Sequence, residues 1–585
     1  MNQEGEGPIL AAKYGSGIDF GSPSHCHSIQ WGYFPVEKYF DKHPEYYAII
    51  DGKRNGSLWF GQICYSRPNL AEELIAKMKE FILADEAEAK KTGQTPPRIY
   101  DISINDSRNF CECSECAEKV RKYNASGTLL LVLNKVAAAL EEFRPGYTLQ
   151  TLGYFATTEP PKGGVKPAKN LVVRVCNTET FLHVPITHKL NEKYRKQVES
   201  WAAQADALFP WEYSITYGNG AGRLPYPSEF NIADNMRFYA ANKGIGIFFE
   251  HENPDFNDLY DCKVWMEAKL MEDPTLKTED LMNDFCHKFY GAAGKFVLEY
   301  RKALLDAAMK NNFKVDYFFH YAEDFRYLNW ETWKKCQAIA AKAREAVKGN
   351  DALTHHVDRA FASLDYAIIS PLSWFYRMEA DKAGEHALFE KHFAVSAERY
   401  YQCHSRSIDE LSLIEKREVT TRVRQAAVSA YNRAKSTKIG KIPAKKGSII
   451  LAPDCWSGTH STVHPAEYGI TEAFCRIPLT KSREGKVKFV YGRWNVSAQK
   501  ATVIERKIID LAPLKGKGAQ MVEIGVFPVF DDHLILNVYE RPTLNWRADF
   551  LRDHFDGKKV KISAEIKWDG GKYVEIGALE FSAAE

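Results

Sequence analysis

Two acidic residues follow strand-like apolar runs of the sequence, where a carboxylate can reach a bound ligand. Glu250 follows GIGIFF, in which Phe248 and Phe249 would surround it with apolar surface. An apolar surround raises the pKa of a carboxyl group, as a general acid requires. Asp106 follows the run ISIN in the same way. Most glycosidases use a pair of carboxylic residues that flank the glycosidic bond to be cleaved.

Plainer interpretations compete with this one. Glu179 and Glu212 also lie at or near expected strand ends. For Glu250 the alternative is a salt-bridged residue at the rim of a fold, because strand ends carry ordinary acids too. For Asn105-Asp106 the alternative is a turn or a helix cap.

Side chains suited to holding a sugar gather near these acids. Aromatic rings stack on the apolar faces of sugars, although one face of such a strand is ordinarily core. Histidine, asparagine and glutamate side chains can hydrogen-bond sugar hydroxyls, although a structural role is as common for loop histidines. The candidate substrate-binding residues are Trp31, Trp211, Tyr213, His25, Asn105 and Glu252.

Three clustered cysteines, Cys111, Cys113 and Cys116, follow Asp106 in the pattern CxCxxC. They could supply three thiolates to a metal, but no second CxxC follows, and a fourth ligand would have to come from Cys176 or His25. The alternatives are a tight loop whose thiols only pack, or a disulfide within the loop. We therefore expect no metal and no cofactor.

Composition excludes several function classes. The 585 residues carry a net charge of +2, with 45% hydrophobic and 26% charged residues, which offers no broad electrostatic field for nucleic acid. No apolar run is long enough to span a membrane. The opening residues, MNQEGEGPIL, lack the basic and apolar regions of an export signal. The partner that we expect is an oligosaccharide or the glycan of a glycoprotein.

Alternating strand and helix patterns must position these residues. Short apolar runs predict strands, and longer runs with helical spacing lie between them. Repeated units of this kind favour a (β/α)8 barrel of the TIM type, whose active sites lie at the carboxyl ends of the strands. The expected strands are 99–104, 148–155, 171–176, 207–213 and 245–249, and the expected helices are 71–83, 128–143, 191–204, 232–241 and 259–270.

The pattern changes twice further along. Helical spacing is continuous from about residue 278, and the basic stretch 436–448 is typical of a linker. Alternating apolar and polar residues then predict an all-β sandwich of the jelly-roll type. We therefore expect a catalytic barrel at 1–275, a helical bundle at 276–440 and a sandwich at 447–585 that could bind carbohydrate.

Several segments taken in order resemble a bacterial family first described only as domain-of-unknown-function 4838 and now classed as glycoside hydrolase family 163. They are KYFDKHPEYYAIIDGKRNG, QICYSRPN, ISINDSRNFCECSEC, LNKVAAALEEFRPGYTLQTLGY, PWEYSITY and GIGIFFEHE. The resemblance covers about residues 20 to 300. On it, Asn105 and Asp106 match the most recognisable motif, Cys111, Cys113 and Cys116 match a cysteine pattern, and Glu250 matches an acidic strand-end position.

The resemblance implies an exported endo-β-N-acetylglucosaminidase of Bacteroidetes-like bacteria, acting at the periplasm or cell surface on the core of complex N-glycans. In glycosidases of this kind the acetamido oxygen of the substrate often replaces an enzyme nucleophile. Glu250 would then be the acid/base and Asp106 would position that group, with retention of configuration. The rival interpretation is a glycan-binding protein with a degenerate, non-catalytic barrel.

Overall fold

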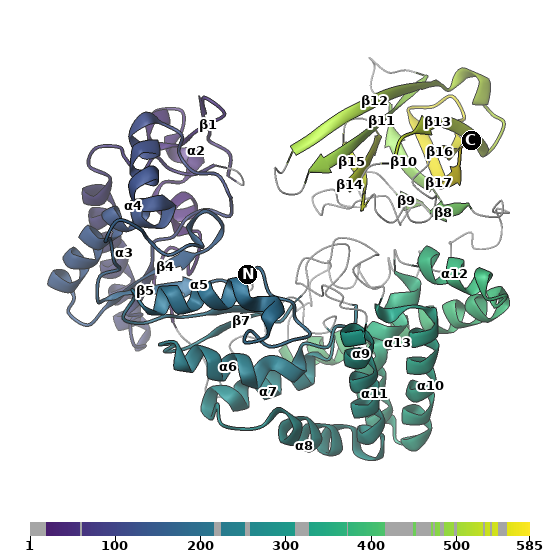
Figure 1. The fold of residues 1–585 in the computed structure, drawn as a ribbon, viewed down its shortest axis with the longest axis horizontal. Helices are drawn as coiled ribbons and strands as arrows, with labels where there is room; N and C mark the ends of the chain where they lie inside the picture. The colour runs from purple at the N-terminus through teal and green to yellow at the C-terminus, as the bar shows by residue number, and fades with distance from the viewer. Residues whose placement is uncertain are drawn as a thin grey trace. The chain divides into compact units, whose positions relative to one another are not determined.

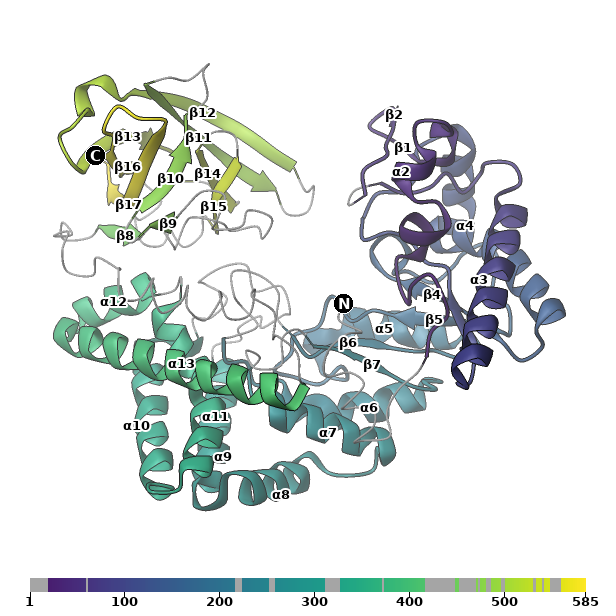
Figure 2. The ribbon, with the colours of Figure 1, turned by 180° about the vertical axis from the view of Figure 1, so that it is seen from behind.

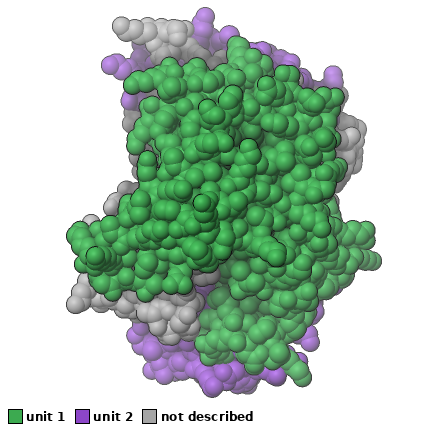
Figure 3. All heavy atoms as spheres, turned by 90° about the vertical axis from the view of Figure 1, so that its left-hand side faces the viewer, with its two compact units in different colours: residues 1–214, 228–250, 265–278 green, residues 215–227, 251–264, 279–585 purple. Residues whose placement is uncertain are grey.

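Helices and several small sheets make up the computed structural model of this mixed α/β chain (Figures 1 and 2). It describes residues 19–58, 61–215, 224–251, 258–310, 327–370, 373–415, 448–451, 470–471, 474–479, 485–495, 500–529, 533–538, 541–547 and 559–584. The chain divides into two compact units, coloured in Figure 3. The first holds residues 1–214, 228–250 and 265–278, and the second holds 215–227, 251–264 and 279–585.

Parallel strands form the centre of the first unit. β3 (Ile99–Asp101), β4 (Thr148–Gly153) and β5 (Leu171–Val175) make one sheet, and β6 (Trp211–Tyr213) pairs with β7 (Phe248–Glu250). All five residues of β5 are buried, as expected for a parallel strand that is covered on both faces. The five predicted strands are present but shorter than predicted, and β7 also ends one residue later than predicted, at Glu250.

Isolated bridges join these two sheets. Val173 bridges to Leu208 and Cys176 bridges to Trp211, both in parallel, so β6 lies beside β5. On the far side of β3, Phe20 bridges to Ile99. Parallel pairing therefore follows chain order from Phe20 to β7. Among the described residues, no pairing joins β7 back to Phe20, so closure of the sheet into a barrel stays a prediction.

Most successive strands are connected by helices, as parallel pairing requires. α3 and α4 lie side by side, and α4 contacts β4, the central strand of its sheet (Figures 1 and 2). The helices of this unit are α2 (Val36–Tyr39), α3 (Leu70–Thr92), α4 (Ser114–Phe143), α5 (Glu192–Ala202), α6 (Ile232–Ala241) and α7 (Tyr260–Glu272), whose first residues belong to the second unit. Short elements complete it: η1 (Ile29–Tyr33), η2 (Pro44–Tyr46), β1 (Ile49–Ile50), β2 (Lys53–Arg54), η3 (Phe155–Thr157), η4 (Lys189–Asn191) and η6 (Glu229–Asn231).

The described residues of the second unit between 279 and 415 are mostly helical, while the predicted bundle with bounds 276–440 stays a prediction. This region contains α8 (Thr278–Tyr290), η8 (Gly291–Ala293), α9 (Gly294–Lys310), α10 (Trp330–Ala346), α11 (Asp351–Ile369), α12 (Ser373–Lys382) and α13 (His386–Glu415). Residues 416–447, which include nearly all of the predicted linker, lie outside the described part of the chain. No helix among the described residues combines the length and apolar character needed to cross a membrane.

Two antiparallel sheets follow in the second unit. One has the order β13-β16-β17-β10-β9 with β8 on β17, and the other has the order β12-β11-β14-β15. Tyr491 of β11 stacks on Phe527 of β13 with ring centroids 4.3 Å apart, so the sheets touch there. The sandwich of jelly-roll type stays a prediction. The strands are β8 (Ile449–Leu451), β9 (Ile470–Thr471), β10 (Phe474–Pro478), β11 (Lys486–Asn495), β12 (Lys500–Asp510), β13 (Gln520–Phe527), β14 (His533–Val538), β15 (Arg541–Arg547), β16 (Val560–Lys567) and β17 (Tyr573–Ala583), with η11 (Ala512–Leu514).

Candidate functional site

Asp106 is an exposed carboxylate just beyond the carboxyl end of β3. The hydroxyl of Tyr154, at the end of β4, donates to Asp106 Oδ1 over 2.9 Å. β3 and β4 are parallel neighbours, so their carboxyl ends meet at one edge and bring these two side chains together. The predicted acid is therefore held in place by a hydroxyl while it stays open to a ligand.

Asn105, its neighbour, is buried and bonded within the protein. Its side-chain amide donates to the carbonyls of Leu58 (2.6 Å) and Gly61 (3.0 Å), and its Oδ1 accepts from Trp31 Nε1 (3.1 Å). Trp31 itself is 44% exposed. Asn105 was predicted to bind substrate, but its side-chain groups are used to hold a loop and to orient the indole ring of Trp31.

Glu250 is the last residue of β7 and is only 9% exposed. Trp211 Nε1 donates to Glu250 Oε2 over 2.8 Å. Tyr213 is the register partner of Glu250, so both side chains project from the same face of the sheet. The structure thus brings Trp211, Tyr213 and Glu250 together, as the sequence predicted.

The apolar surround of Glu250 differs from the predicted one in one respect. Phe248 is on the same face as Glu250 and packs edge-on against Trp211 with ring centroids 4.6 Å apart. Phe249 is on the opposite face, because side chains alternate along a strand. It lines a cavity there, so its predicted contribution to the surround of Glu250 is wrong.

A buried arginine lies beside this group. The guanidinium carbon of Arg174 is 4.2 Å from the ring centroid of Trp211 and 4.3 Å from that of Phe248. Arg174 Nη1 donates to the carbonyl of His25 over 3.0 Å and lies 3.2 Å from His25 Nδ1. Burial, followed by the charge of Arg174, lowers the pKa of His25 to about 3. His25 is therefore a neutral ring that accepts at Nδ1, stacked on Trp211.

The segment from His25 to His27 links the two groups of side chains. His25 packs on Trp211, and the His27 ring lies 5.9 Å from the ring of Tyr154 while its Nδ1 pairs with the carbonyl of Ile104 over 2.8 Å. His27 has a positive φ of 51°, which is uncommon for a residue other than glycine. Such a backbone persists only where its surroundings enforce it, and it is typical of functional sites.

The two remaining strand-end acids have other surroundings. Glu212 accepts from Asn177 Nδ2 at both oxygens (3.0 and 2.9 Å) and from the hydroxyl of Tyr239, on the face of β6 opposite Trp211. Burial raises its pKa to about 7. Glu179 accepts from Lys193 Nζ over 2.8 Å. Both acids therefore have protein partners that account for them.

A cavity of about 430 Å³, counting space open to solvent, lies on the Glu212 side of β6. Glu250 and Asp106 are not among its lining residues. Its lining mixes polar residues with apolar ones such as Phe181, Ile232, Met236 and Phe249, and it includes the predicted substrate-binding residue Tyr213. The cavity therefore lies apart from the acids that carry the candidate chemistry.

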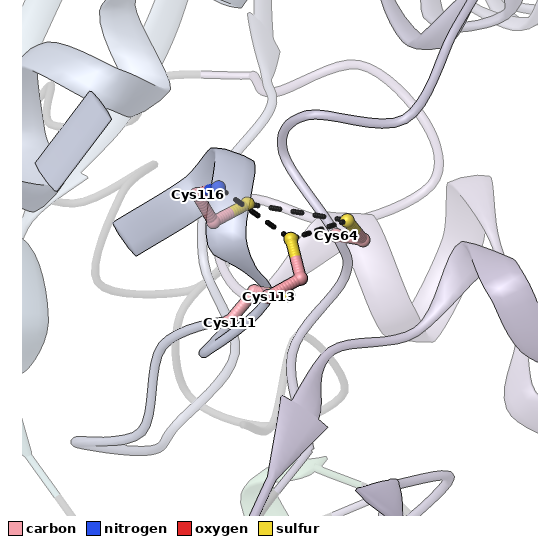
Figure 4. A group of neighbouring side chains, drawn as sticks. All are labelled: Cys64, Cys111, Cys113 and Cys116. Atoms are coloured by element: carbon pink, nitrogen blue, oxygen red, sulfur yellow. Dashed lines mark hydrogen bonds between the residues drawn. The ribbon is translucent and has the colours of Figure 1, made fainter. Parts of the chain in front are cut away.

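Four thiols converge near the start of α4 (Figure 4). Cys64, Cys111, Cys113 and Cys116 have sulfur atoms that all lie within 4.8 Å of one another. The fourth thiol is thus Cys64, and neither Cys176 nor His25 is part of the group. The expectation of no metal depended on a missing fourth ligand, which the fold supplies.

Sequence reasoning missed several residues of this site. Tyr154 ends a predicted strand, and a hydroxyl at that place was a usable signal. Arg174, within an apolar strand, was a second one, because a charged residue in a buried run needs a reason. Glu252 lies outside the described residues.

Comparisons with known proteins bear on the first unit. Residues 12–302 match the family model described as "Domain of unknown function (DUF4838)", and this range contains every predicted site residue. A comparison with curated proteins gave no match.

One similar solved structure is a double Glu-to-Gln variant of CpGH89 from Clostridium perfringens, in complex with its substrate GlcNAc-α-1,4-galactose. It is 11% identical, the alignment covers 71% of this chain and 45% of that one, and the TM-score is 0.35. The chain thus spans less than half the length of that protein. A likeness at this level assigns neither fold nor function.

Proposed function

We propose that this protein is a glycoside hydrolase that cuts β-linked N-acetylglucosamine within the core of complex N-glycans. The observation that carries the proposal is the pair of strand-end carboxylates. Glu250 ends β7, and Asp106 lies five residues after the end of β3 in the same parallel series. Each accepts a hydrogen bond from an aromatic side chain, Asp106 from Tyr154 and Glu250 from Trp211. Carboxyl ends of parallel strands are where such folds bind ligands. Closure into a TIM-type barrel is part of the proposal.

Glu250 is the acid/base in this scheme. It is nearly buried, among Trp211 and Phe248, and general acids work in such surroundings. It donates its proton to the departing glycosidic oxygen and then takes one from the attacking water. Trp211 Nε1 donates to Glu250 Oε2 and orients the carboxyl group.

Asp106 orients the acetamido group of the substrate. It is exposed and held by Tyr154, so it can accept the N–H of that group without first losing a protein partner. The acetamido oxygen attacks the anomeric carbon, and water then opens the resulting ring with net retention. Exposed Trp31, oriented by Asn105, offers an aromatic face to a neighbouring sugar.

Released glycans test the proposal. The full chain is incubated with a complex-type glycoprotein, the products are analysed by mass spectrometry, and the anomer is followed by NMR. We expect free oligosaccharide ending in one N-acetylglucosamine with the β configuration retained. The Glu250→Gln protein should release glycan at least about 10²-fold more slowly, since general acid catalysis contributes a rate factor of about that size or more.

Glu179→Gln is the matched control, because it removes another strand-end acid that is paired with a surface lysine. It should release glycan as the unchanged protein does. Binding of the glycoprotein without any release would overturn the proposal in favour of a non-catalytic glycan-binding protein. Equal release by the Glu250→Gln protein would overturn the assignment of the acid/base.

A further inference from the structure

The four-thiol cluster joins two loops that are distant in the sequence. The backbone between Tyr46 and Ile49 holds both. Cys64 N donates to the carbonyl of Tyr46 over 2.8 Å, and Glu112 N donates to the carbonyl of Ile49 over 2.9 Å. Main-chain pairing on the two sides of this segment therefore brings Cys64 to the CxCxxC loop.

The sulfur positions fit one metal ion. Four ligands around a tetrahedral Zn²⁺ with Zn–S bonds of about 2.3 Å lie about 3.8 Å apart. Cys64 Sγ lies 3.7 Å from Cys113 Sγ and 3.9 Å from Cys116 Sγ. A disulfide would need a separation of about 2.05 Å. All four cysteines are free thiols in this structure, and Cys111 Sγ lies within the same 4.8 Å limit (Figure 4).

Hydrogen-bond donors surround the sulfur atoms. Ile49 N donates to Cys111 Sγ (3.5 Å), and Cys116 N donates to Cys113 Sγ (3.4 Å). Cys116 Sγ hydrogen-bonds Ser66 Oγ over 3.1 Å. Four thiolates around a divalent cation carry a net negative charge, which these N–H groups offset. Thiols that only fill space need no such donors.

We propose that Cys64, Cys111, Cys113 and Cys116 bind one Zn²⁺ in a closed, structural site. Four thiolates fill the tetrahedron and leave no position for water or substrate, so the ion takes no part in bond cleavage. Cys64, Cys111 and Cys116 are buried, and Cys113 is half-buried, which gives the ion a path of entry.

The ion stabilises the loop that presents Asp106. Cys64 comes two residues after Gln62, whose side chain bonds the backbone of Asn105 and Ser107. Cys111 comes five residues after Asp106. The zinc site thus links the segment after Gln62 to the segment after Asp106 and restricts the backbone of Asn105 and Asp106 from both sides.

Metal content of the full chain tests the inference. Protein purified from zinc-supplemented medium under reducing conditions should contain one zinc per chain by inductively coupled plasma mass spectrometry. Replacement of zinc by Co²⁺ should give the intense visible absorption of tetrahedral cobalt with thiolate ligands. Prolonged chelation should lower the melting temperature.

Cys113→Ser is the informative variant. Cys113 caps helix α4 through its sulfur atom, and serine is a preferred residue at that position, so the helix start is preserved while a ligand is lost. We expect this variant to lose the cobalt spectrum and most of its zinc, with a melting temperature that no longer responds to the chelator. Cys336→Ser, a single buried thiol in α10, should keep both.

Two outcomes would overturn the inference. One is that the purified wild-type protein contains no bound metal, although thiol titration after denaturation shows that all four cysteines of the cluster are reduced. The other is a disulfide between any two of the four cysteines in peptide maps of the native protein. Neither measurement depends on glycosidase activity.

Discussion

Gln62 pairs with both backbone groups of Asn105. Gln62 Oε1 accepts from Asn105 N, and Gln62 Nε2 donates to the Asn105 carbonyl, both over 3.2 Å. Gln62 and Asn105 are each 1% exposed, so water does not replace these hydrogen bonds. A single side-chain amide therefore pairs with the backbone in the segment between the end of β3 and Asp106, as a neighbouring strand would.

Replacing Gln62 with methionine should destabilise the protein. The side chain keeps its length but loses the acceptor and the donor, so the buried N–H of Asn105 loses its Gln62 partner, while the Asn105 carbonyl keeps the bond from Ser107 N over 2.7 Å. A buried backbone group left unpaired costs on the order of 1–3 kcal/mol. Urea denaturation followed by circular dichroism should show a lower free energy of unfolding by about that amount for the first unit.

The same substitution at Gln402 is the control. Gln402 is exposed on α13, and its Nε2 donates to Glu398 Oε1 over 2.9 Å. A change within about 0.5 kcal/mol is expected there. Equal effects at the two positions would mean that the pairing with Asn105 contributes nothing specific.

Tyr154→Phe should lower kcat without a comparable change in KM. The hydroxyl of Tyr154 donates to Asp106, and losing a hydrogen bond to a charged group costs roughly 1.5–3 kcal/mol. If that bond holds Asp106 for the reaction, kcat falls by about 10- to 100-fold in glycan-release assays. Asp106→Asn should lower it further.

Tyr147→Phe provides the comparison for Tyr154. The Tyr147 hydroxyl also donates to a carboxylate, Glu86 Oε1, over 3.0 Å, but just ahead of β4, at the opposite end of the strand. This variant should keep the wild-type kcat. A fall as large as that of Tyr154→Phe would show that tyrosine hydroxyls act here through stability alone.

Trp31→Ala should weaken glycan binding more than Trp31→Phe. Alanine removes the exposed aromatic face, whose contact with another ring system is worth about 0.5–1.5 kcal/mol, so the dissociation constant should rise by up to about tenfold. Phenylalanine keeps a face and loses only the bond to Asn105. Isothermal titration on the Glu250→Gln background measures both, and indistinguishable affinities would rule out stacking by Trp31.

The strands and helices that carry the site were predictable because each is a short local pattern. β5 is a run of five buried residues, all of them apolar except Arg174. α6 spans residues 232–241, as expected. The place of Glu250 followed from the same reasoning, since the apolar run stops there. Side chains alternate between the two faces of a strand. Along β6 and β7 this alternation also predicts that Glu212 and Phe249 lie on the face opposite Trp211 and Phe248.

The thiol cluster was not predictable in the same way. Cys64 lies 47 positions before Cys111 in the sequence, in the segment QICYSRPN, with no spacing rule that relates it to CxCxxC. The two meet because both pair with the backbone between Tyr46 and Ile49, and that contact belongs to the fold. The hydrogen-bond partners of Asn105 were not predictable either, because Leu58, Gly61 and Gln62 are some 45 residues away in the sequence.

Glu212 should make the stability of the protein fall as the pH rises through the weakly acidic range. Burial raises its pKa from 4.5 to about 7 in the folded protein, despite the hydrogen bonds from Tyr239 and Asn177. Between these two values the folded chain keeps a proton that the unfolded chain has released. The free energy of unfolding therefore decreases across that window, by about 3 kcal/mol in all.

Glu212→Gln removes this titration, because the amide is neutral at every pH. Urea unfolding measured at intervals from pH 4.5 to 7 should show a flatter dependence for this variant than for the unchanged protein. Glu192→Gln is the control, since Lys196 lowers the pKa of that exposed carboxyl and its loss leaves the fall in place. An unaltered slope in the Glu212→Gln protein would mean that Glu212 is already ionised in the fold, with Asn177 and Tyr239 strong enough as donors to offset its burial.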